Sequence, residues 1–230
     1  MSNIIGIGGK AKHGKDSIAN VLIDNFGYKR ISLADPLKKI LYIGLKEYFT
    51  LNDFYDQNIK DLTFDKYTSY PELVLTKVQI ERIVCAININ YNLTGVEMDI
   101  IREWFRNEKF YSLRDLMQRF GTDLCRNLIN KQIWILTSQK QINHTSINSP
   151  EINFVISDIR FPEERQMVKN LNGLLLLVKR DLKIEGEVHT SEQSLGDDSE
   201  YNTIIHNTST LEDLEKNIIK LHKSKYPLFK

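Results

Sequence analysis

The stretch from Ile4 to Ser17 constrains the fold more than any other part of this chain. A short apolar run, IIGI at residues 4–7, is followed by GKAKHGKDS at residues 9–17 and then by apolar residues at helical spacing. This is the G-x-x-x-x-G-K pattern of a P-loop, in its usual context between a strand and a helix. The glycines let the backbone turn tightly and present N–H groups, which attract phosphate oxygens together with the positive end of the helix. The alternative is a Gly-rich turn whose lysines are merely solvated.

Several side chains of this loop carry the charge that phosphate binding needs. Lys15 is expected to reach the β- and γ-phosphates of a nucleotide, and Lys10 and Lys12 add positive charge. The position after Lys15, where Ser or Thr usually binds Mg²⁺, is Asp16, and Ser17 comes next. A carboxylate is a good Mg²⁺ ligand, so metal binding is retained, and either Asp16 or Ser17 can supply the contact.

The composition is that of an ordinary globular protein and excludes several other classes. Of the 230 residues, 41% are hydrophobic and 27% are charged, and the net charge of +1 predicts neither a nucleic-acid nor a membrane partner. The start of the chain lacks a signal-peptide pattern, and no run of 18 apolar residues occurs. Cys85 and Cys125 lie in apolar helical patterns, which predicts two buried thiols in a reducing compartment. We therefore expect a cytoplasmic protein, in the host cytoplasm if its source is viral.

Strand-like and helix-like segments alternate along the chain. Apolar strand candidates occur at residues 4–7, 28–33, 152–156, 174–178 and 203–207. Helical patterns separate them, which predicts an α/β fold of about five mostly parallel strands with helices on both faces, in a single domain over residues 1–230. Residues 50–111 have weaker patterns, and we interpret them as a helical insertion that covers the binding edge of the sheet. Within it, helices are predicted near 76–89 and 97–104, with a turn at 88–92.

Two carboxylates follow predicted strands. Asp35 comes after the strand at 28–33 and precedes Pro36, so Asp35 is expected to cap a helix, to lie beside a bound ligand, or to do both. Asp158 ends the apolar run at 152–156, which is the Walker B pattern of a Mg²⁺-binding carboxylate. Because ligands of open α/β sheets bind at the carboxyl ends of the strands, both aspartates are predicted at the edge that carries the P-loop.

The helix predicted near residues 112–128 has two distinct faces. After an S-x-x-D capping pattern, its buried stripe is expected to consist of Leu113, Leu116, Met117, Phe120, Leu124 and Leu128. On the polar face, Arg119 and Arg126 are seven residues apart and can converge on one anion. The alternative is a solvated face on which Arg119 pairs with Asp123. Gly121, in the middle, favours a kink or a close approach.

Later segments leave further alternatives open. Arg160 and Glu164, four residues apart at the start of another helix, form either a salt bridge or a phosphate-binding arginine that is held by its partner. Residues 181–200 are polar and contain HTSE at 189–192, which suits either a mobile lid or an ordinary surface loop. A polar loop is predicted at residues 143–150.

Taken in order, several of these stretches resemble deoxynucleoside monophosphate kinases of the bacteriophage type. The stretches are residues 9–17, LADPLK at 33–38, QRFGTD at 118–123 with Arg126 and Trp134, SDIRFPEE at 157–164, and HTSE at 189–192. The resemblance covers most of the chain outside residues 50–111. It implies a P-loop kinase fold similar to adenylate kinase, in which the γ-phosphoryl group of ATP passes to a deoxynucleoside monophosphate with Mg²⁺.

The resemblance also implies a place for each candidate residue. The ATP phosphates would be held by five residues of the loop: Lys12, Gly14, Lys15, Asp16 and Ser17. Lys10 and Asp35 would face the acceptor phosphate. The nucleoside monophosphate pocket, to which the insertion at 50–111 would contribute, would contain Arg119, Thr122, Asp123, Arg126 and Trp134. Asp158 would lie near the metal, with Arg160 and Glu164 near the transferring group or the acceptor. Of these residues, Lys15, Asp35 and Arg160 would act in catalysis.

Two other functions fit the same motifs. One is phosphorylation of a different small molecule, as in dephospho-coenzyme A or phosphomevalonate kinases. The other is a non-enzymatic module that binds a nucleotide to control assembly with a partner. A guanine-specific GTPase is disfavoured because the chain contains no N-K-x-D segment. The expected partner is a small-molecule substrate, and a homodimer is left open.

Overall fold

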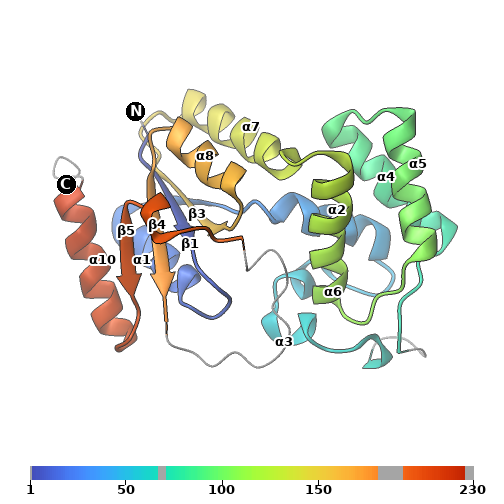
Figure 1. The fold of residues 1–230 in the computed structure, drawn as a ribbon, viewed down its shortest axis with the longest axis horizontal. Helices are drawn as coiled ribbons and strands as arrows, with labels where there is room; N and C mark the ends of the chain where they lie inside the picture. Colours follow the sequence, from blue (N-terminus) through green and yellow to red (C-terminus); the bar gives the residue numbers. More distant parts are fainter. Residues whose placement is uncertain (1, 67–70, 181–193, 226–230) are drawn as a thin grey trace. The chain divides into compact units, whose positions relative to one another are not determined.

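Five strands form one parallel sheet around the strand that leads into the P-loop (Figure 1). The structure is a computed structural model that describes residues 2–66, 71–180 and 194–225. The strands are β1 (Ile4–Gly8), β2 (Lys29–Ile31), β3 (Phe154–Ile159), β4 (Leu174–Lys179) and β5 (Thr203–His206), in the order β2-β3-β1-β4-β5. Every pairing in this sheet is parallel. The predicted α/β architecture is confirmed.

The chain divides into two compact units, which we describe separately. Unit 1 contains Met1–Leu33 and Ser138–Lys230, and unit 2 contains Ala34–Thr137. Unit 1 holds the whole sheet and the P-loop. Unit 2 is built from helices and turns, with isolated β-bridges such as the one between Leu73 and Phe110.

Helices cover both faces of the sheet in unit 1 (Figure 1). On one face lie α1 (Lys15–Phe26) and α10 (Leu211–Lys225), whereas α8 (Pro162–Asn170) packs on β1 and β4. Alternate residues of β1 point to these two layers. Ile5 and Ile7 join the core with α1 and α10, whereas a Cβ on Gly6 would lie 2.8 Å from a methyl carbon of Val168 in α8. β1 is therefore buried on both faces, as expected of a central parallel strand.

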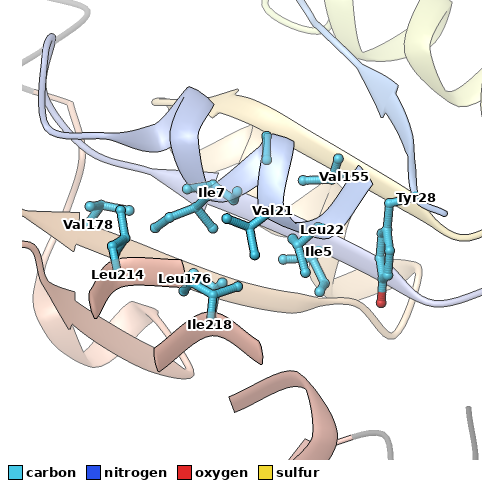
Figure 2. Packing of buried hydrophobic residues seen from close by; sticks show 12 residues of the cluster. Ile5, Ile7, Val21, Leu22, Tyr28, Val155, Leu176, Val178, Leu214 and Ile218 are labelled. Carbon is cyan, nitrogen blue, oxygen red and sulfur yellow. The ribbon is translucent and has the colours of Figure 1, made fainter. Parts of the chain in front are cut away.

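The core beneath α1 and α10 is apolar (Figure 2). Its side chains include Ile5 and Ile7 of β1, Val21 and Leu22 of α1, and Leu214 and Ile218 of α10, together with Val155 of β3 and Leu176 of β4. Full burial of one such side chain stabilises the fold by about 1.5–3 kcal/mol. This packing holds α1 against the sheet, so the start of the helix stays next to the end of β1.

A glycine bounds the first helix at each end. Gly14 precedes it with φ 102°, and Gly27 follows it with φ 66°, where the Gly27 N–H donates to Ile23 O. Both φ values are in the range that glycine adopts most easily, so the two glycines define the helix.

Unit 2 consists of helices around a cluster of aromatic side chains. Its longer helices are α2 (Asp35–Leu45), α4 (Lys77–Tyr91), α5 (Gly95–Asn107), α6 (Leu113–Gln118) and the π-helix η3 (Arg119–Ile129). Short turns of helix precede α4: η1 (Leu51–Phe54), α3 (Gln57–Lys60) and η2 (Phe64–Lys66). A last helix, α7 (Ile133–Asn148), starts in unit 2 and ends in unit 1. The buried aromatic residues include Phe49, Phe54, Phe64, Phe105, Phe110 and Phe120.

The predicted buried stripe is confirmed except at Met117 and Leu128. Leu113, Leu116, Phe120 and Leu124 are fully buried, whereas Met117 is half-buried and Leu128 is 54% exposed. Leu128 lies in the last turn of the π-helix, one residue before its end at Ile129. Gly121 lies in this segment, and a Cβ there would be 2.4 Å from a methyl carbon of Leu37, which confirms the predicted close approach.

The structure moves three helix boundaries. The polar loop predicted at 143–150 is helical as far as Asn148, because Ser138 and Ile142 are buried and continue the helical period. The turn predicted at 88–92 is the end of α4, which closes with Asn92 at φ 52°. Asp35 does not cap α2, because Ala34 occupies the cap and Asp35 is the first helical residue.

One thiol differs from the prediction. Cys125 is buried, but Cys85 is exposed. The buried face of α4 runs through Ile80, Ile83, Val84 and Ile87, so position 85 is turned away from it. Within the described ranges, none of the helices is long and apolar enough to cross a membrane.

Candidate functional site

The loop after β1 has the backbone geometry of an anion-binding turn. Gly9, Lys12 and Gly14 have φ values of 150°, 62° and 102°, so the chain turns back on itself before α1 begins. A Cβ on Gly9 would lie 2.7 Å from Val178 O, so only glycine allows this approach to β4. The loop thus joins the carboxyl end of the central strand to the positive end of a helix, where anions are favoured.

The lysines of the loop lie toward its surface. The Lys15 ammonium donates to Lys10 O at 2.7 Å, so it folds back over the loop. Lys10 and Lys12 are exposed. Three ammonium groups on one short turn create a positive potential that suits a chain of phosphates.

The residues after Lys15 offer oxygen ligands, but one of them is already engaged. Asp16 is 68% exposed and pairs with Arg30 at 3.3 Å, and Arg30 also donates to Asn20 Oδ1 at 2.7 Å. Ser17 is half-buried in the first turn of α1. A metal ligand at Asp16 would therefore compete with Arg30, whereas Ser17 has a hydroxyl in the same turn.

Asp158 is held at the end of β3 by the end of β2. Its Oδ2 accepts from Ser32 Oγ at 2.7 Å, and its Oδ1 accepts from Leu33 N at 3.0 Å. These bonds orient the carboxylate. Among the described residues there is no cluster of three or more His, Cys, Asp or Glu side chains that could hold a metal ion.

Glu164 lies in the interior and holds the backbone of Arg160. It is 7% exposed, and its Oε2 accepts from the N–H groups of Arg160 at 2.6 Å and Phe161 at 2.9 Å. Burial, with a smaller contribution from the charge of Asp158, raises the pKa of Glu164 to about 7 against the lowering effect of these two bonds. The arginine is thus held by its partner through its peptide N–H.

Arg165, which the sequence analysis did not single out, binds the backbone carbonyl of Arg160 from the interior. Arg165 is 1% exposed, and its Nη1 donates to Arg160 O at 2.9 Å and to Ser194 O at 3.0 Å. Its Nε and Nη2 bind both carboxylate oxygens of Glu200, at 2.8 and 3.1 Å. Nothing in its local pattern distinguishes it from a surface residue of α8, and only burial reveals its role.

In unit 2, Arg119 is held by carboxylates and aromatic rings. It pairs with Glu108 and with Asp115, the latter at 3.8 Å, and donates to Lys109 O at 2.8 Å. Its guanidinium lies 5.0 Å from the ring centre of Phe110. The partners of Arg119 in the structure are thus Glu108, Asp115 and Lys109, whereas the alternative interpretation named Asp123.

The remaining pocket candidates of unit 2 are Thr122, Asp123, Arg126 and Trp134. The indole N–H of Trp134 donates to Gly121 O at 3.0 Å, and the ring packs edge-on against Tyr91 at 5.9 Å. Thr122 is buried, whereas Asp123 is half-buried. Arg126 Nη1 donates to Asn127 Oδ1 at 3.3 Å at the surface.

Asp35 belongs to a second cluster of unit 2. Its Oδ1 accepts from the hydroxyl of Tyr55 at 3.1 Å and lies 3.6 Å from Lys38 Nζ. Lys38 Nζ in turn lies 3.9 Å from the ring centre of Tyr55. Burial, followed by the charge of Asp35 and its hydrogen bond, raises the pKa of Tyr55 to about 12. The sequence missed Tyr55, because residues 52–70 are rich in aromatic and polar residues without a clear period.

The structure collects the candidate residues into two sets, one in each unit. Unit 1 contains the P-loop residues with Asp158, Arg160 and Glu164, and unit 2 contains Asp35 and the candidates from Arg119 to Trp134. The HTSE motif at 189–192 lies outside the described residues.

Comparison with known proteins gives one consistent family. The profile described as deoxynucleotide monophosphate kinase matches residues 3–218. A relative from Acanthamoeba polyphaga mimivirus, named provisionally as such a kinase, is 26% identical over 226 residues, which is 94% of each chain. The deoxynucleotide monophosphate kinase of Enterobacteria phage T4 is 24% identical over 235 residues, 92% of this chain and 95% of its own. A dephospho-CoA kinase from Campylobacter jejuni superposes with a TM-score of 0.44 and 15% identity, over 99% of this chain and 98% of its own.

Proposed function

The chain belongs to the deoxynucleotide monophosphate kinase family, and we propose which of its residues transfer the γ-phosphoryl group of ATP to a deoxynucleoside monophosphate. The observation that carries the assignment is the loop before α1. Lys15 begins the helix, Gly14 precedes it with φ 102°, and both follow the central strand of the sheet. A triphosphate on this loop meets N–H groups, a helix start and three lysines.

Unit 1 supplies the ATP side of the reaction in this proposal. The N–H groups from Gly14 to Ser17 and the ammonium of Lys15 hold the phosphates, and Lys12 adds charge. Lys15 gives up its contact with Lys10 O when a phosphate arrives, because a charge-assisted bond to phosphate is stronger than one to a neutral carbonyl. Its positive charge then offsets the charge that develops during transfer.

We propose Mg²⁺ as the cofactor, held by Asp158 together with Asp16 or Ser17. The oriented carboxylate of Asp158 supports this, because hard oxygen ligands suit Mg²⁺. The ion would neutralise charge on the phosphates of ATP. Omission of Mg²⁺, and Asp158→Asn, are both expected to abolish transfer.

Unit 2 supplies residues for the acceptor nucleotide. Arg119 and Arg126 are proposed to bind the monophosphate, with Asp123, Thr122 and Trp134 completing the pocket. The contacts of Arg119 with Glu108 and Phe110 support this, because they hold a guanidinium in one orientation.

Asp35, Lys10 and Arg160 are proposed to act on the phosphate groups. Asp35 orients rather than removes a proton, because an acceptor phosphate is already ionised and needs no strong base. Lys10 adds charge for the acceptor phosphate. Arg160 faces the transferring group, and Glu164 acts through the Arg160 N–H instead of touching the substrate.

A coupled assay of ADP release tests the proposal. ATP is supplied with dAMP, dCMP, dGMP or dTMP, each in turn, with and without Mg²⁺. Turnover that needs both an acceptor and Mg²⁺ supports the assignment. Slow ATP hydrolysis that no acceptor stimulates would favour a nucleotide-binding assembly module, and turnover with only dephospho-coenzyme A would favour that kinase class.

The proposed substrates also indicate where in the cell the enzyme acts and which partners it has. ATP and deoxynucleotides are cytoplasmic metabolites, so we propose that the chain works in the cytoplasm on small molecules. The net charge of +1 supports a partner other than nucleic acid. A homodimer stays a proposal that sedimentation analysis tests.

A further inference from the structure

The segment that follows β5 reaches the P-loop through one buried side chain. Asn207 comes directly after β5 and is 6% exposed. Its Nδ2 donates to the carbonyl of His13, in the middle of the P-loop, at 2.9 Å. Its own N–H donates to Lys179 O at 2.8 Å, which fixes its backbone to β4. We infer that Asn207 is a positioning residue for nucleotide binding, acting on the His13–Gly14 peptide; this rests on the proposed role of the loop in holding ATP.

The planarity of the peptide connects that bond to the phosphate site. In a trans peptide the C=O and the N–H point in opposite directions. Because Asn207 draws the His13 carbonyl toward the interior, the N–H of Gly14 points the opposite way. A phosphate-binding loop needs its N–H groups to converge on the anion. One buried amide therefore sets the direction of one phosphate donor.

The bond from Asn207 also disfavours the flipped orientation of the His13–Gly14 peptide, in which the carbonyl and the N–H exchange directions. A Cβ on Gly14 would lie 2.5 Å from Asn207 Nδ2, so the asparagine closes the space on that side of the loop. If the peptide turned over, the Gly14 N–H would face the Nδ2 donor, and a buried donor would lose its acceptor. A buried donor without an acceptor destabilises that orientation of the peptide. The asparagine thus favours the binding-competent peptide before any ligand arrives.

A second buried side chain holds the same stretch from β4. His13 is 7% exposed, and its Nδ1 lies 3.2 Å from Val178 O and 3.2 Å from the N–H of Arg180. The two contacts need opposite states of Nδ1, so each tautomer makes one of the two bonds. In both states the ring is tied to the end of β4. The loop is therefore held by the ends of two neighbouring strands.

The substitution Asn207→Ala removes the amide and leaves the His13 carbonyl without that donor. The affinity for ADP, a nucleotide that occupies the loop without reacting, is expected to fall about tenfold, the size of one oriented hydrogen bond. The KM for ATP is expected to rise similarly, whereas the KM for the deoxynucleoside monophosphate stays within about twofold. A purely structural role would lower thermal stability without this difference between the two substrates.

Asn202, at the other end of β5, is the matched control. Its Oδ1 accepts from Leu175 N at 2.8 Å, and its N–H donates to Leu175 O at 2.9 Å. Asn202→Ala removes a comparable bond to β4 at the opposite end of the strand, so it is expected to lower the melting temperature and leave ADP affinity unchanged.

Aspartate substitutions at positions 207 and 202 separate the loss of a hydrogen bond from the loss of side-chain packing. Asn207 uses its amide as a donor, so Asn207→Asp keeps the shape and loses the bond. Asn202 uses its amide oxygen as an acceptor, so Asn202→Asp keeps the bond. Asn207→Asp also provides a well-packed variant if Asn207→Ala does not fold.

Calorimetric titration with ADP, melting curves and steady-state kinetics test the inference on the full chain. Weaker ADP binding in both Asn207 variants, with normal binding in both Asn202 variants, supports it. The inference is overturned if both Asn207 variants bind ADP as tightly as the wild type does, or if Asn202→Ala loses as much ADP affinity as Asn207→Ala. It is also overturned if only Asn207→Asp loses ADP affinity, because the added negative charge alone explains that loss. Absence of dNMP-dependent turnover in the wild type would remove the proposed function, while the ADP titrations would still test Asn207.

Discussion

The two units hold their candidate residues by different means. In unit 1 the backbone conformation sets the shape of the P-loop. The loop follows the central strand, and it turns through positive φ values at Gly9, Lys12 and Gly14. In unit 2 side chains hold other side chains. Arg119 binds Glu108, 11 residues away, and Asp35 accepts from Tyr55, 20 residues away. A side-chain substitution in the P-loop of unit 1 should therefore remove a functional group without changing the shape of the loop. A substitution in unit 2 should instead change the orientation of a neighbouring side chain.

The largest effect is expected from Lys15→Ala. Loss of the ammonium should lower kcat by about 10³-fold, the scale of removing a group that stabilises developing charge. The melting temperature should stay within about 2 °C of the wild type, because surface changes rarely alter stability by more than ~0.5 kcal/mol. Coupled kinetics and melting curves measure both quantities. Lys29→Ala, an exposed lysine of β2, is the control, and near-normal kcat in Lys15→Ala would refute the assignment of the loop.

Glu164→Gln tests a strongly perturbed carboxyl of unit 1. Burial raises its pKa from 4.5 to about 7 in the folded state. Between these two values the unfolded chain loses the proton first, so wild-type stability falls as pH rises, by about 3 kcal/mol in total, and levels off above pH 7. Glutamine has no such titration, and its oxygen can still accept from the Arg160 N–H.

Melting curves from pH 4 to 8 show the effect. Relative to Glu164→Gln, the wild type is expected to lose about 5–10 °C across this range. Parallel curves for the two proteins would show that the pKa of this carboxyl is the same in the folded and the unfolded chain, in conflict with its burial.

Arg126→Ala tests the proposed binding of the acceptor monophosphate by unit 2. The KM for the deoxynucleoside monophosphate is expected to rise at least about tenfold, the value of a charge-assisted bond, with the KM for ATP nearly unchanged. Arg102→Ala is the control, because Arg102 binds Glu81 at 2.8 Å and Asp99 at 2.9 Å within unit 2 and has no assigned ligand. Equal losses for both substrates would contradict the assignment.

The smallest effect is expected from Tyr55→Phe. The ring that faces Lys38 remains, and only the hydroxyl bond to Asp35 is lost. A partly exposed hydrogen bond is worth about 0.5–1 kcal/mol, so kcat/KM for the acceptor should fall about two- to fivefold. Tyr48→Phe, a similarly exposed tyrosine of the same unit, should be neutral. If both variants are neutral, Asp35 does not depend on its side-chain partner.

The sequence was most informative where one local rule sufficed. Gly14 and Gly27 bound α1, and the strands of the sheet follow apolar runs. It failed where burial decided the outcome. Leu128 was expected in the buried stripe but is exposed, and the predicted loop at 143–150 is helical as far as Asn148 although most of its residues are polar.

The same limit applies to the candidate site. The motif residues from Lys10 to Ser17 and Asp158 were identified from sequence, because their pattern encodes a strand, a turn and a helix start. Arg165, Tyr55 and Asn207 were not identified, because each acts on a residue that is distant in the chain or in another element. Their roles depend on which groups folding brings within hydrogen-bond distance.

The amino-acid order alone determined the P-loop motif and the parallel sheet, because glycine conformations, apolar periods and helix starts are local properties of the chain. The order of the motifs along the chain carried the resemblance to the kinase family. Only the tertiary structure decided which side chains hold the loop and the arginines in place. Those contacts join residues far apart in sequence, and their strength depends on burial, which no short pattern contains.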